Sequence, residues 1–131
     1  MLAAVLAIGE KEKISGAEFV LAYLLGVEVE CRQSNHEGVL VDWLHDARGQ
    51  VHAVLINAGA YTHTSIALHD ALKAADVPAV ELHLSNVHKR EAFRHHSYIS
   101  MRADAVMAGF GTQGYTLALE RVARIVHGHK A

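Results

Sequence analysis

Hydrophobic positions along the chain follow two different spacings. Short apolar runs that are rich in β-branched residues and end in glycine or polar residues are typical of strands. Such runs occupy residues 26–33, 51–60, 78–86 and 104–111. Between them, apolar residues recur at helical spacing: Val39, Leu40, Trp43, Leu44 and Ala47; Ile66, Ala67, Ala71 and Leu72; and Leu117, Leu119, Val122, Ile125 and Val126. Because strands and helices alternate, the sequence predicts a doubly wound parallel sheet in a three-layer α/β/α sandwich.

The apolar runs differ in how polar their second face is. Residues 53–56 are continuously apolar, as in a central parallel strand that is buried on both faces. Residues 27–30 and 81–84 alternate, which predicts an edge strand or a strand with a functional face. Ligands of doubly wound sheets bind beyond the carboxyl ends of the strands. The segments at those ends are residues 32–38, 57–65, 83–97 and 109–115.

Length and composition exclude several classes of protein. A chain of 131 residues with one proline, Pro78, fits a single domain, residues 1–131. The net charge of −2 argues against nucleic acid as the main partner. One cysteine, Cys31, excludes an internal disulfide framework and fits a reducing compartment. The apolar stretch after Met1 is too short for a membrane span and has no signal-peptide pattern, so we expect a cytoplasmic protein.

Eleven histidines raise the question of a metal site, because four of them lie in the segment ELHLSNVHKREAFRHHSYIS, residues 81–100. No acidic residue or cysteine joins these histidines at a spacing typical of zinc. Arg90 and Arg94 lie four residues apart, so a helix would place them on one face. Their positive charge repels a metal ion and favours a carboxylate. The sequence therefore predicts a pocket for an anion and no metal.

Two polar positions next to the predicted strands are candidates for the site. Asn57 directly follows a buried strand, where an amide beside a helix N-terminus can bind a carboxylate or hydroxyl, unless it merely closes the turn. Thr62, Thr64 or Ser65 can cap the helix that follows. Glu81 lies two residues before His83, so both face the same side of a strand and Glu81 can orient the imidazole. A purely structural ion pair is the alternative for these two residues.

Five motifs together resemble the type II 3-dehydroquinate dehydratase family in their order and spacing. They are RQSNHEG, DWLHDARG, NAGAYTHTSIALHDAL, PAVELHLSNVHKREAFRHHSYIS and GFGTQGYTLAL, and the resemblance covers residues 26 to about 126. It implies a flavodoxin-like fold, trimers packed into a dodecamer, and the reversible dehydration of 3-dehydroquinate to 3-dehydroshikimate through an enolate. The reaction belongs to aromatic amino-acid biosynthesis by the shikimate pathway or to quinate catabolism. No metal, Schiff base or other cofactor is implied.

The same resemblance implies roles for individual residues. His83 would be the acid that protonates the departing hydroxyl, and Glu81 would orient it. The substrate-binding residues would be Asn57 with the backbone N–H groups of Leu84 and Ser85 at the carboxylate region, His63 and Arg94 at the ring hydroxyls, and Asp70 from a neighbouring subunit.

Residues 1–25 depart from the family's pattern, because its NGPNLNLLG stretch and the REP and YG motifs of its lid are absent there. That lid supplies an arginine and the tyrosine that acts as the base. Residues 2–9 still fit a first strand and residues 13–26 an abbreviated helix, in which Tyr23 would pack as a core residue. Loss of a positioned base lowers rates about a hundred- to ten-thousand-fold. We therefore expect a dehydratase of impaired activity or, as the alternative, a non-catalytic oligomeric protein that retains the dehydroquinate pocket.

Overall fold

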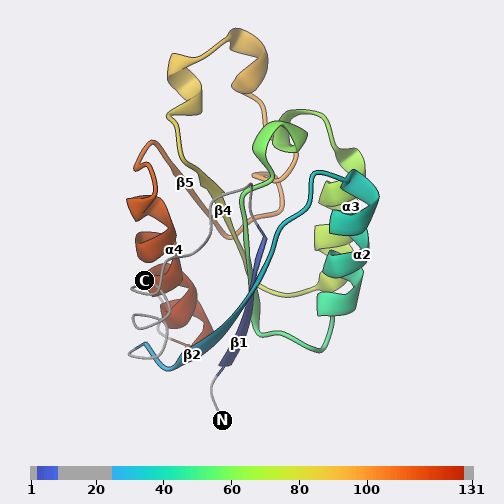
Figure 1. The fold of residues 1–131 in the computed structure, drawn as a ribbon, viewed down its shortest axis with the longest axis vertical. Coiled ribbons are helices and arrows are strands. Elements are labelled where there is room, and N and C mark those ends of the chain that lie inside the picture. The colour runs from blue at the N-terminus through green and yellow to red at the C-terminus, as the bar shows by residue number, and fades with distance from the viewer. Residues whose placement is uncertain (1–2, 9–24, 129–131) are drawn as a thin grey trace.

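The described part of the protein is a five-stranded parallel sheet with helices on both faces (Figure 1). The structure is a computed structural model that describes residues 3–8 and 25–128. The strands are β1 (Ala3–Ile8), β2 (Val27–Arg32), β3 (Ala53–Ile56), β4 (Ala79–His83) and β5 (Ala105–Ala108), in the spatial order β2-β1-β3-β4-β5. This is the flavodoxin-like order, so the predicted fold class is confirmed.

Three α-helices of the described residues cover the two faces of the sheet. Helices α2 (Glu37–Ala47) and α3 (Ile66–Ala75) lie side by side on one face, and α4 (Gln113–Val126) covers the other (Figure 1). All three lie where the apolar spacing predicts helices. The side chain of Ser65 caps α3 by accepting the Leu68 N–H at 2.9 Å, as one of the three candidate caps.

Two apolar clusters, one on each face, form the core. Leu44, Ile56 and Leu68 represent the cluster beneath α2 and α3, and Leu55 and Leu119 the cluster beneath α4. All four residues of β3 are buried, because this strand lies in the middle of the sheet with helices on both sides. The continuous apolar run at residues 53–56 predicts this central position correctly.

The two alternating runs have different positions in the sheet. Strand β2 is an edge strand, as its alternation suggests, with Glu28 and Glu30 exposed. Strand β4 is not at an edge: it pairs with both β3 and β5, and all five of its residues are buried. The polar residues of β4 are therefore buried in the sheet, which excludes the edge position and leaves a functional face as the other explanation of the pattern.

The segment after β4 is not one continuous helix. Residues 84–97 instead contain two short 3-10 helices, η2 (Val87–Lys89) and η3 (Ala92–Arg94), which project from the carboxyl end of the sheet (Figure 1). Arg90 lies between the two helices, so the helix that would place Arg90 and Arg94 on one face does not form. The first strand expected at residues 2–9 is observed as β1, whereas the expected helix at 13–26 lies almost entirely outside the described residues.

The central position of β3 predicts the effect of a cavity in the core. Leu55 is fully buried, so Leu55→Ala should lower the free energy of unfolding by about 2–5 kcal/mol, measured by urea denaturation. Val106 on β5 is 52% exposed, and Val106→Ala serves as the control with an expected loss below about 1 kcal/mol. Equal losses for the two variants would contradict the assignment of β3 as the central strand.

Candidate active site

A pocket of about 230 Å³ lies at the carboxyl ends of β3 and β4. Its lining residues are Asn57, Gly59, Ala60, His63, His83, Leu84, Ser85, Val87, Arg90 and Arg94. They come from the ends of the two strands, from the 3-10 helix η1 (Gly59–His63) and from the projecting segment after β4. The pocket thus lies where ligands bind in doubly wound folds.

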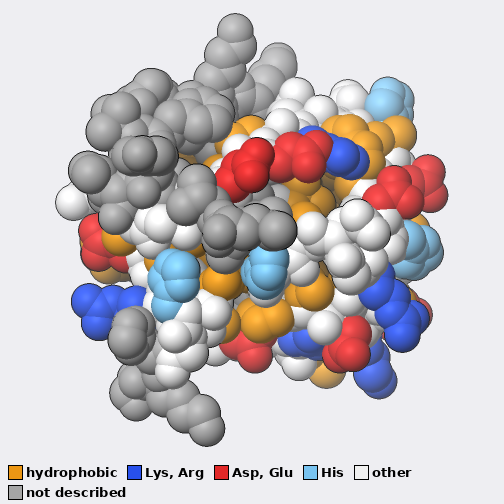
Figure 2. All heavy atoms as spheres, turned by 90° about the horizontal axis from the view of Figure 1, so that it is seen from below, with side chains coloured by type: hydrophobic (Ala, Val, Ile, Leu, Met, Phe, Trp, Pro, Cys, Tyr) orange, Lys and Arg blue, Asp and Glu red, His pale blue; other side chains and the backbone are white. Residues whose placement is uncertain are grey.

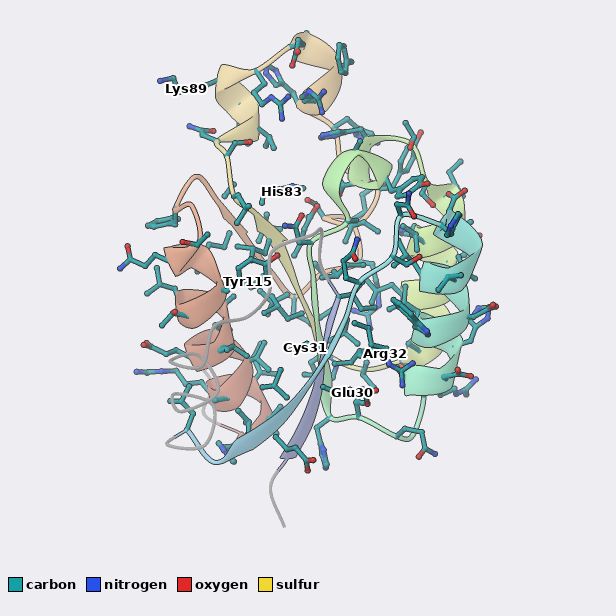
Figure 3. The ribbon with its side chains drawn as sticks, in the orientation of Figure 1. Glu30, Cys31, Arg32, His83, Lys89 and Tyr115 are labelled. Atoms are coloured by element: carbon teal, nitrogen blue, oxygen red, sulfur yellow. The ribbon has the colours of Figure 1, made fainter. Side chains whose placement is uncertain are left out.

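A buried carboxylate supports the pocket from below. Glu81 is fully buried in β4, and its Oε1 accepts a hydrogen bond from His83 Nε2 at 2.7 Å. The two residues are two apart on one strand, so their side chains project from the same face of the sheet. His83 is 6% exposed and lies at the top of β4, where it lines the pocket (Figure 3).

Three hydroxyl groups also donate hydrogen bonds to Glu81. Thr62 Oγ1 and Ser97 Oγ donate to Oε1 at 2.5 and 2.7 Å, and Ser100 Oγ donates to Oε2. Burial alone would raise the pKa of the Glu81 carboxyl, but the hydrogen bonds from His83 and the hydroxyls outweigh it and lower the pKa to about 2. Glu81 is therefore a carboxylate anion at neutral pH.

The Glu81 anion determines which nitrogen of His83 carries the proton. A carboxylate only accepts hydrogen bonds, so Nε2 of His83 must be the protonated nitrogen that faces it. The remaining nitrogen, Nδ1, is then a proton acceptor in the neutral ring and a proton donor in the imidazolium. The pair can therefore give up and recover a proton at Nδ1 while Nε2 keeps its hydrogen bond to Glu81.

His63 adds a second imidazole to the pocket. Its ring is stacked on that of His83, with the centroids 6.3 Å apart and the planes 11° from parallel. Nδ1 of His63 lies 2.7 Å from the carbonyl oxygen of His96, which fixes Nδ1 as the protonated nitrogen. Nε2 of the neutral ring is then a hydrogen-bond acceptor that suits a ligand hydroxyl.

Asn57 is held in one orientation at the end of β3. Its Oδ1 accepts the Gly59 N–H at 3.2 Å, and its Nδ2 donates to the hydroxyl of Tyr115 at 3.1 Å. Asn57 is 6% exposed and lines the pocket, so its amide is both buried and fixed. A fixed amide is a suitable donor for a carboxylate or hydroxyl of a ligand.

Positive charge dominates the pocket. Arg90 and Arg94 line it beside the two histidines, and the lining residues within the described part of the chain include no carboxylate. Arg94 Nε donates to the exposed Glu91 at 2.8 Å, which holds one edge of the guanidinium and leaves its other donors for a ligand. The pocket therefore favours a small anion that carries hydroxyl groups.

In the part of the chain that the structure describes, the opposite end of the molecule has no such excess of one charge. Acidic and basic side chains are interspersed there over the described surface (Figure 2).

A larger cavity, of about 340 Å³, lies between β2 and α2. It is lined by charges of both signs, among them Glu30, Arg32 and Asp46, and Arg32 lies over the Trp43 ring, 5.5 Å from its centroid. This cavity lacks a buried acid–imidazole pair, so its size does not make it the reactive centre. Among residues 3–8 and 25–128, no group of three or more His, Cys, Asp or Glu residues is arranged to hold a metal ion.

Most of the residues singled out in the sequence lie together. Glu81 lies directly beneath the pocket, and seven of them line it: Asn57, His63, His83, Leu84, Ser85, Arg90 and Arg94. Asp70 is exposed on α3 and is not among the residues that line the pocket of the same chain. Sequence reasoning missed the contacts of Thr62, Ser97 and Ser100 with Glu81, and that of Tyr115 with Asn57.

The low pKa of Glu81 predicts how the protein responds to acid. Because the folded-state pKa of about 2 lies below the ordinary 4.5, the ionised group stabilises the fold above pH 4.5, and this contribution is lost as the pH falls toward 2. The difference corresponds to about 3 kcal/mol. The free energy of unfolding, measured by urea at pH 6 and pH 3, should therefore fall more steeply in the wild type than in Glu81→Gln. Parallel pH dependence in the two proteins would contradict the assignment.

Comparison with known proteins agrees with this geometry. The family described as Dehydroquinase class II matches residues 12–123. The chain is 64% identical over 99 residues to 3-dehydroquinate dehydratase from Variovorax paradoxus, covering 72% of this chain and 68% of that protein. It is 57% identical over 115 residues to the enzyme of the same name from a Marinomonas species, covering 84% and 75%.

A solved structure shows the same similarity in three dimensions. The type II dehydroquinase from Propionibacterium acnes superposes with a TM-score of 0.84 and 32% sequence identity, covering 92% of this chain and 98% of that one. The family match spans most of the chain, and the pocket lies within it. The chain therefore belongs to the class II dehydroquinase family.

Proposed function

We propose that the pocket described above catalyses the reversible dehydration of 3-dehydroquinate to 3-dehydroshikimate. The observation that carries this proposal is the buried pair of Glu81 and His83 at the floor of a cationic pocket, in a chain of the class II dehydroquinase family. The type II family catalyses this dehydration, and relatives with up to 64% identity bear the name of the enzyme. The protein is a hydro-lyase, and the comparisons do not favour the non-catalytic alternative.

The carboxylate of the substrate would bind at the strand ends. Leu84 and Ser85 directly follow β4 and line the pocket, so their backbone N–H groups are available to an anion. The fixed amide of Asn57 lines the same pocket and offers a further N–H. We assign these three residues to the carboxylate region because neutral, preorganised donors bind an anion with little reorganisation.

The ring hydroxyls of the substrate would lie near His63 and Arg94. His63 presents Nε2 as an acceptor, whereas the guanidinium of Arg94 offers only donors. A hydroxyl group both donates and accepts, so the two side chains can together recognise the orientation of a hydroxylated ring. An apolar analogue of the same size would leave both groups unpaired.

His83 would supply the proton for elimination. After a proton leaves the carbon next to the ketone, the resulting enolate re-forms the ketone and expels the hydroxyl group from the neighbouring carbon. The imidazolium of His83 donates its Nδ1 proton to that hydroxyl, which departs as water, and the neutral ring is left hydrogen-bonded to Glu81. In the hydration direction, the same Nδ1 accepts the proton of the attacking water.

The group that removes the carbon-bound proton is not assigned among the described residues. Tyr23, which the sequence predicts to be a core residue, lies outside them. The described residues already provide the acid, its carboxylate partner and the anion-binding donors. Because the base is not assigned among them, we expect an activity lower than that of family members with a complete lid.

Oligomerisation and location are further parts of the proposal. Asp70 projects from the exposed surface of α3, where it is available to a second copy of the chain, in line with its proposed place in a neighbouring pocket within a trimer-based dodecamer. None of the described helices is long and apolar enough to cross a membrane. We propose a cytoplasmic enzyme on the separate basis of its cysteine usage.

The proposal predicts a specific loss of activity on removal of the acid. Purified protein should raise the absorbance of a 3-dehydroquinate solution as the conjugated enone of the product forms. His83→Ala should lower kcat about a hundred- to ten-thousand-fold, because it removes the proton donor. His45→Ala, at an exposed position on α2, is the matched control and should retain the wild-type rate. Equal turnover in the wild type and His83→Ala would refute the role of His83.

A further inference from the structure

Tyr115 connects helix α4 to the floor of the pocket. It is the third residue of α4 and is 5% exposed among the apolar residues that this helix buries against the sheet. Its hydroxyl accepts the hydrogen bond from Asn57 Nδ2 at 3.1 Å, across 58 positions of sequence. Figure 3 shows Tyr115 on the α4 side of the sheet, below His83. Tyr115 does not line the pocket itself, but its hydroxyl contacts Asn57, which does.

The loop before α4 brings Tyr115 to this position. Gly109 and Gly111, both with positive φ, donate their N–H groups to the carbonyl oxygens of His83 and Leu84, at 3.2 and 2.9 Å. A Cβ atom at Gly114 would lie 2.8 Å from Leu82 Cδ1, so this glycine allows the start of α4 to approach β4 closely. The segment that carries Tyr115 is therefore bound to the same strand end that carries the pocket.

Tyr115 and Gly59 together fix the amide of Asn57. The Gly59 N–H can only donate, so it determines that Oδ1 is the atom that faces it. The Tyr115 oxygen accepts one of the two Nδ2 hydrogens, which leaves the other for a ligand in the pocket that Asn57 lines. Without the tyrosine oxygen, the amide can rotate about its side-chain torsion and its free N–H loses a fixed direction.

We infer that Tyr115 is a positioning residue that sets the affinity for the substrate by holding the Asn57 amide, a role that rests on the proposed function. Asn57 would contact the carboxylate, whose charge does not change while the hydroxyl group departs. Its orientation contributes equally to binding in the ground state and the transition state. Loss of this orientation therefore raises KM and leaves kcat nearly unchanged.

Tyr115→Phe tests this role because it removes one oxygen atom and retains the buried ring. KM for 3-dehydroquinate should rise about threefold to tenfold, the effect of one neutral hydrogen bond. The value of kcat should change by less than about twofold. Tyr98→Phe is the matched control, since the Tyr98 ring packs edge-on against His96. This control should retain the wild-type KM.

A double-mutant cycle separates positioning from a general loss of structure. If Tyr115 acts through Asn57, adding Tyr115→Phe to Asn57→Ala should leave KM unchanged from that of Asn57→Ala alone. A rise in KM of the same size in both backgrounds would show that Tyr115 acts on the fold, and it would overturn the inference. An unchanged KM in the single Tyr115→Phe variant would overturn it as well.

The outcomes also distinguish this inference from the proposed function. Turnover by the wild type with an unaltered KM in Tyr115→Phe contradicts the role of Tyr115 alone. A well-folded wild type that neither turns over nor binds 3-dehydroquinate, by calorimetry, contradicts the proposed function and, with it, the role of Tyr115.

Discussion

The carboxylate of Glu81, buried in the interior strand β4, is the constraint on which the site depends. An ionised group without partners in this position would be strongly unfavourable, so the surrounding chain must supply donors. His83 comes from the same strand, Thr62 from η1, and Ser97 and Ser100 from the segment that returns to the sheet after η3. One carboxylate thus holds two other segments, η1 and residues 97–100, against the carboxyl end of the sheet.

The hydrogen bonds that stabilise the buried carboxylate also position the pair of Glu81 and His83 for acid–base chemistry. They keep Glu81 ionised, and the anion fixes the tautomer of His83 with the proton on Nε2. His63 lies in η1, which also carries Thr62, and Arg94 lies in η3, just before Ser97. The residues that donate hydroxyl hydrogen bonds to Glu81 and the residues that line the pocket therefore belong to the same backbone segments. Stability and function are therefore coupled, because a change that breaks the hydrogen bonds to Glu81 would also displace the residues that line the pocket.

The sequence predicts the architecture well because local periodicity decides it. The alternation of strands and helices, the central position of residues 53–56 and the shared face of Glu81 and His83 all follow from spacing. The alternation at residues 81–84 fits an edge strand equally well. The polar side chains are buried there because residues distant in the sequence donate hydrogen bonds, and the local pattern does not reveal those donors. Thr62, read as a possible helix cap, instead donates to Glu81. The contact of Tyr115 with Asn57 depends on helix packing across 58 positions and has no local signal.

A direct measurement of the ionisation of Glu81 tests this account most sharply. The chemical shift of its side-chain carboxyl carbon can be followed by NMR as the pH is lowered, with Glu81→Gln identifying the resonance. The account predicts that this carboxyl remains ionised at pH 4 and begins to take up a proton only as the pH approaches 2. Half-protonation at pH 4.5 or above would contradict the claim that a buried anion organises the site.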